Sequence, residues 1–191
     1  MSDFHGRLQE ILDADSIRTE EPMRNHTTFR IGGAAKYYVT PKTQEQLIET
    51  VRLCRSGNMP FYVIGNGSNL LVSDNGYEGV ILSTECLTSW EVTGEAVRGA
   101  ERGVMITALA GILLSRMAKA AAGESLTGLE FAAGIPGTLG GAVVMNAGAY
   151  GSEMKDVLCW VRVLDRDGQV RQLDAPELEL GYRTSCIPKR G

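Results

Sequence analysis

Glycine is concentrated in one segment of the chain, and this cluster restricts the possible folds more than any other feature. Eight of the 23 glycines lie between Gly123 and Gly151. Because glycine loses more conformational entropy on folding than other residues, such a cluster indicates unusual backbone angles or close backbone approach. Leu, Ile, Val and Met residues are interleaved with the glycines, which argues against low complexity. We therefore predict a folded segment built on backbone contacts.

The charge and the cysteine pattern exclude several classes of protein. The net charge is −4, from 19 basic and 23 acidic residues, whereas a general nucleic-acid binder is normally basic. We therefore expect no nucleic-acid partner. The four cysteines are scattered without a Cys-x-x-Cys pair, and two histidines are present, so we expect no metal site and no disulfide framework. Reduced thiols are typical of the cytoplasm, where we expect the protein.

Residues 131–150 form a stretch long enough to suggest a membrane span. All 20 residues are uncharged, which by length alone is typical of a transmembrane helix. However, the stretch contains five glycines, a proline and an asparagine, and glycine and proline disfavour a continuous helix. The N-terminus lacks the apolar segment of a signal peptide. We therefore expect no membrane span and no signal peptide.

The pattern of the first 84 residues predicts a small α/β lobe. Apolar residues from Phe4 to Leu12 recur on one helical face and indicate a short N-terminal helix, which a polar stretch follows. Thr43 begins a capping box with Gln46, and this predicts a helix that ends at Gly57. The remaining pattern indicates strands at residues 36–40, 61–64, 70–72 and 80–82, with a turn at residues 74–76.

Residues 85–191 predict a second, α+β lobe. Two extended runs, residues 90–93 and 96–98, flank Gly94 and are typical of a hairpin. An Ala/Leu/Ile-rich run at residues 104–122 predicts a helix that Gly123 ends. After the glycine cluster, the pattern indicates strands at residues 157–164 and 170–173, a turn at residues 165–168, and a helix that begins in residues 174–177.

Residues 65–69 (Gly-Asn-Gly-Ser-Asn) follow the strand predicted at residues 61–64. Small residues let successive backbone N–H groups turn toward an anion, and Ser and Asn side chains add donors, so a phosphate or pyrophosphate is a natural ligand. The loop is not a Rossmann fingerprint, because Leu70 occupies the third glycine position, and it lacks the Gly-Lys-Ser/Thr ending of a Walker A loop. From the spacing alone, a tight turn and an anion-binding loop both remain open.

The glycine cluster contains a second candidate site. Gly134-Ile-Pro-Gly-Thr-Leu-Gly-Gly141 is followed by Asn146-Ala-Gly-Ala-Tyr-Gly151. Pro136 fixes one backbone angle and the glycines remove side chains, so the backbone can approach a flat or phosphorylated ligand closely. The lack of charge suits an apolar cofactor such as a flavin ring. Tight packing of small residues between a helix and a sheet is the alternative.

Two further strings contain residues that can bind a ligand. In Gly181-Tyr-Arg-Thr-Ser185, Arg183 offers a forked donor and Tyr182 a hydroxyl donor, which suit a substrate carboxylate or a developing enolate. A surface arginine at a strand end is the alternative. In Asn25-His-Thr-Thr28 and residues 29–33, Thr hydroxyls and glycines suggest backbone near a ligand, although His26 alone is more typical of a hydrogen-bonded structural histidine than of a catalytic one.

In this order, the strings together resemble the UDP-N-acetylenolpyruvoylglucosamine reductase family of bacterial flavoenzymes. Any one string is weakly specific, whereas the ordered set over residues 20–187 is specific. The resemblance favours a flavin over the alternatives left open above. The matching strings are Asn25-His-Thr-Thr28 with Ile31-Gly-Gly33, Ile64-Gly-Asn-Gly-Ser-Asn-Leu70, Gly128-Leu-Glu-Phe-Ala-Ala-Gly-Ile-Pro-Gly-Thr-Leu-Gly-Gly141, Asn146-Ala-Gly-Ala-Tyr-Gly151 and Tyr182-Arg-Thr-Ser185.

The resemblance implies an α+β fold, namely a two-lobed FAD-binding domain of the vanillyl-alcohol-oxidase/p-cresol-methylhydroxylase type, with lobes at residues 1–84 and 85–191. It implies FAD and NADPH as cofactors, and reduction of UDP-N-acetylglucosamine enolpyruvate to UDP-N-acetylmuramate in peptidoglycan precursor synthesis. Arg183 matches the family's catalytic arginine, and Tyr182 would support the substrate carboxylate or this arginine. The implied cofactor-binding residues are Gly65, Asn66, Gly67, Ser68, Asn69 and Leu70 at the pyrophosphate, and Gly134, Ile135, Pro136, Gly137, Thr138, Gly140, Gly141, Ala142, Asn146 and Gly148 at the flavin and its ribityl chain.

The chain departs from the family pattern in one respect. The family carries a C-terminal substrate-binding domain with a catalytic serine in a Gly-Ser-x-Phe-Lys/Arg-Asn-Pro string and a catalytic glutamate, and no such string occurs here. We therefore expect a chain that folds and binds FAD but lacks full turnover. The alternatives are a non-catalytic flavin-binding module, another flavin oxidase of the same fold, and a Rossmann NAD-binding protein, against which Leu70 argues. The sequence leaves the oligomeric state open.

Overall fold

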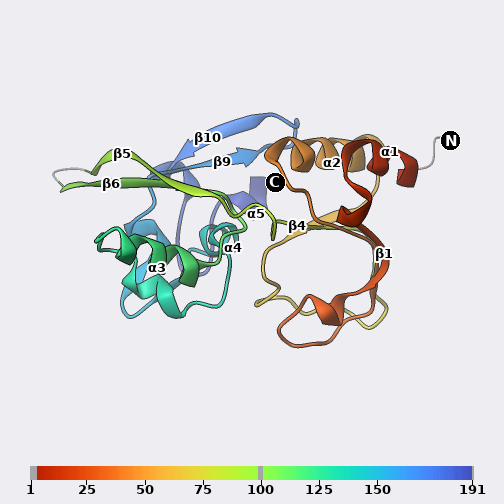
Figure 1. The fold of residues 1–191 in the computed structure, drawn as a ribbon, viewed down its shortest axis with the longest axis horizontal. Coiled ribbons are helices and arrows are strands. Elements are labelled where there is room, and N and C mark those ends of the chain that lie inside the picture. Colours follow the sequence, from red (N-terminus) through yellow and green to blue (C-terminus); the bar gives the residue numbers. More distant parts are fainter. Residues whose placement is uncertain (1–3, 99–100, 191) are drawn as a thin grey trace. The chain divides into compact units, whose positions relative to one another are not determined.

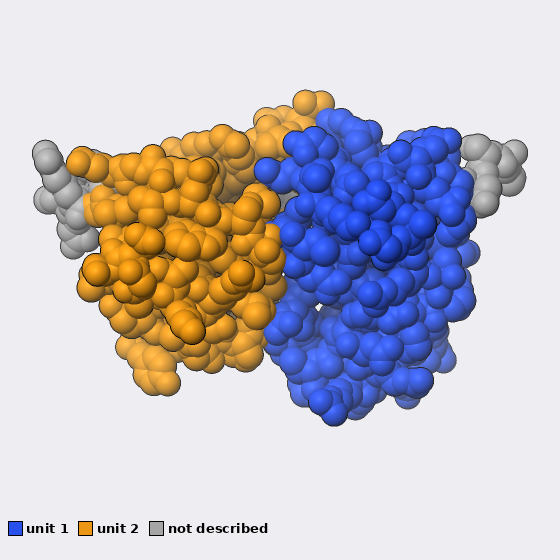
Figure 2. Space-filling model, viewed as in Figure 1, with its two compact units in different colours: residues 1–87 blue, residues 88–191 orange. Residues whose placement is uncertain are grey.

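The computed structural model describes residues 4–98 and 101–190, which cluster into two compact units. Unit 1 comprises Met1–Leu87 and unit 2 comprises Thr88–Gly191 (Figure 2). Each unit combines helices with strands (Figure 1). In the described residues, no helix combines the length and the apolar character needed to cross a lipid bilayer.

Unit 1 is built on a four-stranded mixed sheet. The strand order is β1 (Ile17–Pro22), β2 (Ala34–Val39), β4 (Tyr77–Ser83) and β3 (Phe61–Ile64). β1 pairs antiparallel with β2, whereas β4 pairs parallel with both β2 and β3. The three strands predicted at β2, β3 and β4 are confirmed. β1 was not predicted, because this edge strand is mostly polar and exposed and lacks the alternation of a half-buried strand.

Two helices, α1 (Phe4–Ile11) and α2 (Gln44–Ser56), lie next to each other beside this sheet (Figure 1). Both were predicted, and both are confirmed. Thr43 caps α2, because its Oγ1 accepts the N–H of Gln46 at 3.2 Å. The reciprocal bond of the predicted capping box is displaced by one residue, since Gln46 Oε1 accepts the N–H of Lys42 at 2.8 Å.

The core of unit 1 also receives side chains from a loop. The strand predicted at residues 70–72 is wrong, because these residues belong to no strand. Leu70 and Val72 nevertheless pack against the core, which explains why their apolar character resembles that of a strand. The predicted turn at residues 74–76 is confirmed, since the N–H of Gly76 donates to the carbonyl of Ser73 at 2.9 Å. The buried residues of the cluster that Leu70 and Val72 contact are Met23, Ala35, Tyr38, Ile64 and Ile81.

Unit 2 begins with a hairpin of β5 (Trp90–Arg98) and β6 (Glu101–Ala108), which pair antiparallel (Figure 1). A hairpin was predicted here, but the turn predicted at Gly94 is wrong. β5 continues through Gly94, which has a φ of +140° and lies where the register of the pair shifts. Glycine inside a strand can mark a bulge as well as a turn, and the sequence did not distinguish the two.

The helix predicted at residues 104–122 is correct only in its second part. The helix α3 spans Leu114–Gly123, and residues 104–108 belong to β6 instead. Val104, Ile106 and Thr107 are β-branched, and β-branched residues favour a strand over a helix. The high content of alanine and leucine in the whole run obscured this local preference.

The last strand pair of unit 2 is β9 (Trp160–Leu164) with β10 (Val170–Asp174), which confirms the predicted pair and its turn. β9 begins later than predicted, because the N–H of Val157 donates to the carbonyl of Met154 and closes a 3-10 turn. The helix predicted from residue 174 is one turn, η5 (Ala175–Leu178), with a capping box. The other described elements are η1 (Ala14–Ser16), η2 (Met23–Asn25), η3 (Glu130–Gly134), α4 (Leu139–Val144), β7 (Gly148–Ala149), β8 (Ser152–Glu153), η4 (Met154–Asp156) and α5 (Ile187–Arg190).

The glycine cluster of unit 2 folds onto α3. Residues 131–150 form the end of η3, the helix α4 and the short strand β7, so this uncharged stretch is divided among several elements. Its small side chains join the core of the unit. The buried residues of the cluster that they join are Leu114, Ala118, Phe131, Ala132, Ala142, Val143, Ala147 and Met154.

Candidate functional site

The loop at residues 65–70 directly follows β3 in unit 1. Gly67 is buried and has a φ of +60°, and a Cβ added to it would overlap the carbonyl oxygen of His26. The loop also binds Thr28, because the Thr28 N–H donates to the carbonyl of Gly67 at 3.2 Å and Thr28 Oγ1 donates to the carbonyl of Ser68 at 3.5 Å. The structure therefore brings together two of the strings that the sequence singled out.

The same loop presents backbone donors. Within residues 4–98 and 101–190, the N–H groups of Asn66, Gly67 and Ser68 donate to no backbone acceptor. Asn66 is exposed and Ser68 is half-buried, so their side chains are accessible. Leu70 differs, because its side chain packs on the core. Consecutive N–H groups without backbone acceptors fit an anion, which is the donor set that a pyrophosphate requires.

A polar cavity of about 400 Å³ lies beside this loop in unit 1. Its wall joins the start of the loop to the string at residues 25–28 and to the sheet. The lining residues are Asn25, His26, Thr27, Thr28, Arg30, Tyr38, Gly65, Asn66 and Glu85. Of these, Tyr38 and Glu85 were not predicted from the sequence as site residues, because each lies in a segment outside the strings that the sequence singled out.

His26 is a structural residue of this cavity wall. Its Nε2 lies 2.8 Å from Glu21 Oε1, and its ring stacks on Tyr38 with 3.8 Å between ring centroids. Burial pushes the pKa of Glu21 upward, but the hydrogen bonds from His26 and Asn25 outweigh burial, so the pKa is lowered. Of the two interpretations of His26 left open by the sequence, the geometry supports the hydrogen-bonded structural histidine.

The second candidate segment, residues 134–142, lies in unit 2 and is held by backbone bonds to residues 110–114. The N–H groups of Leu139 and Gly140 donate to the carbonyls of Ile112 and Ala110, both at 2.8 Å. The reverse bond joins Leu114 N–H to the carbonyl of Gly137 at 2.9 Å. Thr138 then caps α4 by accepting the N–H of Gly141. Close backbone approach, which the glycines predicted, is thus confirmed between two protein segments.

Part of this segment faces solvent. Gly134, Pro136, Gly141 and Gly148 are exposed, whereas Thr138, Ala142 and Asn146 are buried. A Cβ added to Gly134 meets no protein atom within 4 Å, and no positive φ is recorded for this residue. The described residues would therefore leave room for a side chain at position 134, and their packing does not explain why this residue is glycine. An open, uncharged backbone surface of this kind fits the flat face of a flavin.

Tyr182 and Arg183 lie at the tip of a tight turn in unit 2. The turn is closed by two hydrogen bonds between Gly181 and Thr184, of 3.1 and 3.3 Å. Tyr182 is 94% exposed and Arg183 is also exposed. Arg183 has a φ of +55°, a conformation that is unfavourable for most L-residues. The predicted catalytic pair is therefore on a surface turn with a defined backbone.

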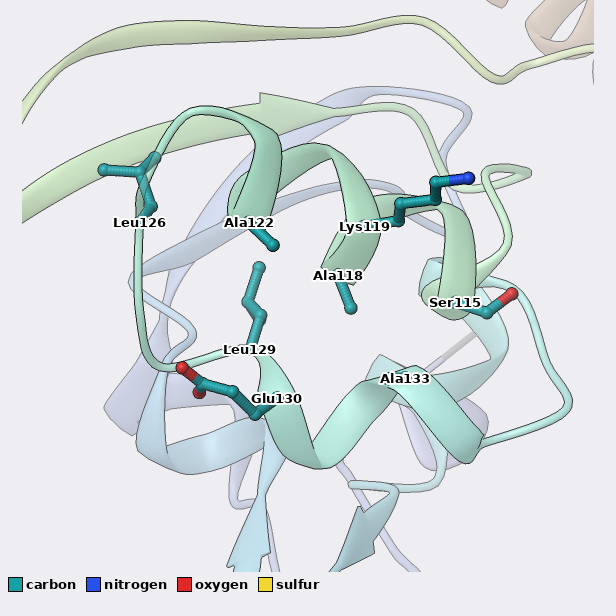
Figure 3. A pocket seen from close by; sticks show the side chains of 8 residues that line it. All are labelled: Ser115, Ala118, Lys119, Ala122, Leu126, Leu129, Glu130 and Ala133. Atoms are coloured by element: carbon teal, nitrogen blue, oxygen red, sulfur yellow. The ribbon is translucent and has the colours of Figure 1, made fainter.

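A second cavity, of about 270 Å³, lies in unit 2 and is lined by none of the predicted site residues. It lies between α3 and η3 (Figure 3). Its wall is mostly apolar, with Lys119 and Glu130 at its edges (Figure 3). The lining residues are Ser115, Ala118, Lys119, Ala122, Leu126, Leu129, Glu130 and Ala133.

The family of the chain follows from comparison with known proteins. Residues 35–174 match the model of a family described as FAD binding domain. The chain therefore belongs to the FAD-binding domain family. A VAO-type flavoprotein from Myceliophthora thermophila has a similar fold, with a TM-score of 0.60 at 13% identity over 74% of this chain and 26% of that chain. The expected α+β fold of this type is confirmed.

Relatives with higher identity are reductases. UDP-N-acetylenolpyruvoylglucosamine reductase from Alkaliphilus oremlandii is 46% identical over 184 residues, which are 96% of this chain and 58% of that protein. The crystal structure of UDP-N-acetylenolpyruvylglucosamine reductase from Thermus caldophilus has a TM-score of 0.71 at 35% identity, over 88% of this chain and 57% of that chain. The predicted resemblance is confirmed, and the chain spans less than two thirds of these relatives.

Proposed function

We propose that this chain binds FAD and supplies the flavin-binding part of an NADPH-dependent reductase that converts UDP-N-acetylglucosamine enolpyruvate to UDP-N-acetylmuramate. The observation that carries the proposal is the loop at residues 65–70. It presents successive N–H groups beside a polar cavity, in a chain whose family is described by FAD binding. The names of the relatives supply the substrate class.

In this proposal, residues 65–70 hold the pyrophosphate of FAD. The N–H groups of Asn66, Gly67 and Ser68 would donate to phosphate oxygens, and the side chains of Asn66, Ser68 and Asn69 would add donors. Leu70 would serve the site indirectly, because its side chain packs on the core of unit 1 and fixes the end of the loop. The bonds from Thr28 hold the middle of the loop.

The segment at residues 134–142, with the exposed Gly148, would lie along the flavin and its ribityl chain. The exposed backbone at Gly134, Pro136 and Gly141 offers a surface without side-chain bulk. The buried residues Thr138 and Ala142 would hold this surface in place rather than contact the cofactor with their side chains. Gly140 is fixed by its bond to Ala110.

Arg183 would act on the substrate. When bound, FAD would supply the chemistry of hydride transfer from NADPH to the enolpyruvyl double bond. Addition of the hydride to the terminal carbon of this double bond would leave negative charge on the carbon that bears the carboxylate, and a fixed cation would meet that charge as it forms, lowering the barrier by about 3 kcal/mol. Tyr182, beside it on the turn, would support the substrate carboxylate or the orientation of Arg183.

The test is the visible spectrum of the purified chain with added FAD, before and after anaerobic NADPH. An oxidised-flavin spectrum that bleaches is expected. Asn66→Ala should raise the Kd for FAD about tenfold through loss of one charge-assisted hydrogen bond. Gln9→Ala, which removes an exposed amide from α1, is the matched control and should leave the Kd unchanged. A parent chain that binds no FAD would contradict the proposal.

A further inference from the structure

Asn146 was expected to contact the flavin, but both of its amide hydrogens are used inside unit 2. Its Nδ2 donates to the carboxylate of Glu153 and to the carbonyl oxygen of Gly181, the latter at 3.1 Å. Its Oδ1 accepts the N–H of Lys155 at 2.9 Å. The residue is 3% exposed. Because an asparagine amide has two hydrogens to donate, its side chain has no donor left for a cofactor.

The bond to Gly181 reaches the turn that contains Arg183. Gly181 O therefore accepts two hydrogen bonds, from Asn146 Nδ2 and, at 3.3 Å, from the N–H of Thr184. Arg183 has a φ of +55°, which costs an arginine on the order of 1 kcal/mol. Such a conformation persists where the surrounding structure holds it, and strained residues of this kind concentrate at functional sites.

A second bond anchors the other end of the turn to the same helix. Ser185 is 1% exposed, and its Oγ donates to the carbonyl of Val144 at 2.8 Å. Val144 is the last residue of α4. Asn146 follows α4 closely, with its N–H donating to the carbonyl of Val143 at 3.1 Å. Both ends of the turn are thus attached to the C-terminal end of α4.

We infer that Asn146 is a positioning residue, which holds the Tyr182–Arg183 turn on the end of α4 by its bond to Gly181. The inference rests on the proposed function, in which α4 lines the flavin and Arg183 meets charge on the substrate. The helix α4 would then position both the flavin and the guanidinium of Arg183. Asn146 acts through Arg183 and would not itself touch the flavin with its side chain.

Three variants distinguish the hydrogen bond between Asn146 and Gly181 from the other hydrogen bonds of the Asn146 side chain. Asn146→Asp removes both donor hydrogens and places a carboxylate against Glu153. Glu153→Gln keeps an acceptor for Asn146 and leaves the bond to Gly181 intact. The double variant restores a donor–acceptor pair between positions 146 and 153, because the amide introduced at position 153 can donate to the carboxylate introduced at position 146. The carbonyl of Gly181 still lacks its side-chain donor in the double variant.

The measurement is amide hydrogen exchange of Gly181 and Thr184, with residues 160–164 of β9 as the internal reference. Exchange in the turn should be at least tenfold faster in Asn146→Asp and in the double variant, and within twofold of the parent in Glu153→Gln. Exchange in β9 should not change. Unchanged exchange in the double variant would overturn the inference, and so would equal acceleration in β9, which would show a general structural role.

A second readout distinguishes this inference from the proposed function. FAD affinity should be within twofold of the parent in all three variants, since the Asn146 side chain is not a flavin ligand in this inference. A tenfold loss of affinity with unchanged exchange would make Asn146 a cofactor ligand and reject the positioning role. A parent chain that binds no FAD would reject the proposed function alone, because the exchange measurement needs no cofactor.

Discussion

The loop of unit 1 and the glycine segment of unit 2 both contain glycine, but for different reasons. At Gly67 the protein itself requires glycine, because φ is +60° and any Cβ would overlap the carbonyl of His26. At Gly134 no protein atom lies within 4 Å of an added Cβ. The first glycine is explained by the fold and the second is not. A glycine that the protein does not need is therefore the better indicator of a ligand.

Gly140 shows that the distinction does not simply follow the two units. It belongs to the same segment as Gly134, yet an added Cβ would lie 2.8 Å from the Cβ of Ala110. The segment thus combines glycine required by packing with glycine that leaves an open surface. Substitution of single glycines can test each of these explanations.

The largest effect is expected for Gly67→Ala. The left-handed backbone and the overlap with His26 O force the loop to move, and the protein should lose at least about 3 kcal/mol of unfolding free energy. Gly6→Ala is the control, because its Cβ meets no atom within 4 Å in α1 and alanine favours a helix by about 1 kcal/mol. Urea unfolding measures both. Equal stability of the two variants would remove the steric explanation of Gly67.

The second effect is a loss of unfolding free energy at high pH, and it should occur in unit 1. Burial raises the pKa of Tyr38 to about 12 and that of Cys54 to about 11, from 10.0 and 9.0. Both folded pKa values lie above the unfolded ones, so the stability is complete below pH 9 and is lost as pH rises through 11 and 12. We expect a loss of about 2 kcal/mol from each group.

Urea unfolding at pH 8, 10 and 12 checks this prediction. Cys54→Ala should remove the part of the loss that begins near pH 9, and Tyr38→Phe the part that begins near pH 10. Spectroscopic probes in β9 of unit 2 serve as the comparison. If both variants keep the parent's full pH dependence, burial of these two groups is not its cause.

The third effect compares two adjacent glycines in α4. Gly140→Ala should destabilise unit 2 by about 2 kcal/mol, since its Cβ would press on Ala110 in a packed region. Gly141→Ala should be neutral or slightly stabilising, because the nearest atom to its Cβ is Thr138 Oγ1 at 3.4 Å and alanine favours a helix. Thermal unfolding of the two variants gives the difference. A lower melting temperature for Gly141→Ala than for Gly140→Ala would contradict it.

The smallest effect on stability, within about 0.5 kcal/mol, is expected for Gly134→Ala. Its effect on the cofactor should be larger, with a rise of about tenfold in the Kd for FAD as the methyl group occupies the ligand surface. Titration with FAD, together with a melting curve, checks both parts. Unchanged affinity would mean that Gly134 does not face the flavin, and would remove the functional contrast between Gly134 and Gly67.

The sequence predicted what depends on local pattern. The capping residue Thr43, the strands β3 and β4, and the pair β9–β10 were all found from periodicity and turn chemistry. β1 was missed, because its pairing with β2 rather than its own polar residues makes it a strand. The bulge at Gly94 was mistaken for a turn for the same reason, since a bulge is defined by its partner strand.

The candidate site shows the same limit. Its loops were found because glycine and small polar residues are visible in the sequence. The hydrogen bond between Asn146 and Gly181 was not predicted. It joins residues 35 apart in the sequence through a side-chain amide, and no rule of sequence spacing predicts such a contact. Tyr38 in β2 and Glu85, which follows β4, both line the polar cavity. The pairing of β2 with β4 brings these segments together, and the sequence did not predict that pairing.

The strand order of the sheet has a consequence for how unit 1 folds. β4 is the last strand of the sheet in the chain, yet it lies between β2 and β3, which have no ladder with each other. During synthesis, β2 and β3 must wait for residues 77–83 before either gains its parallel partner. Closing such non-local pairs is slow. The loop at residues 65–70 lies between β3 and β4, so it takes its final shape only in the last step of sheet assembly.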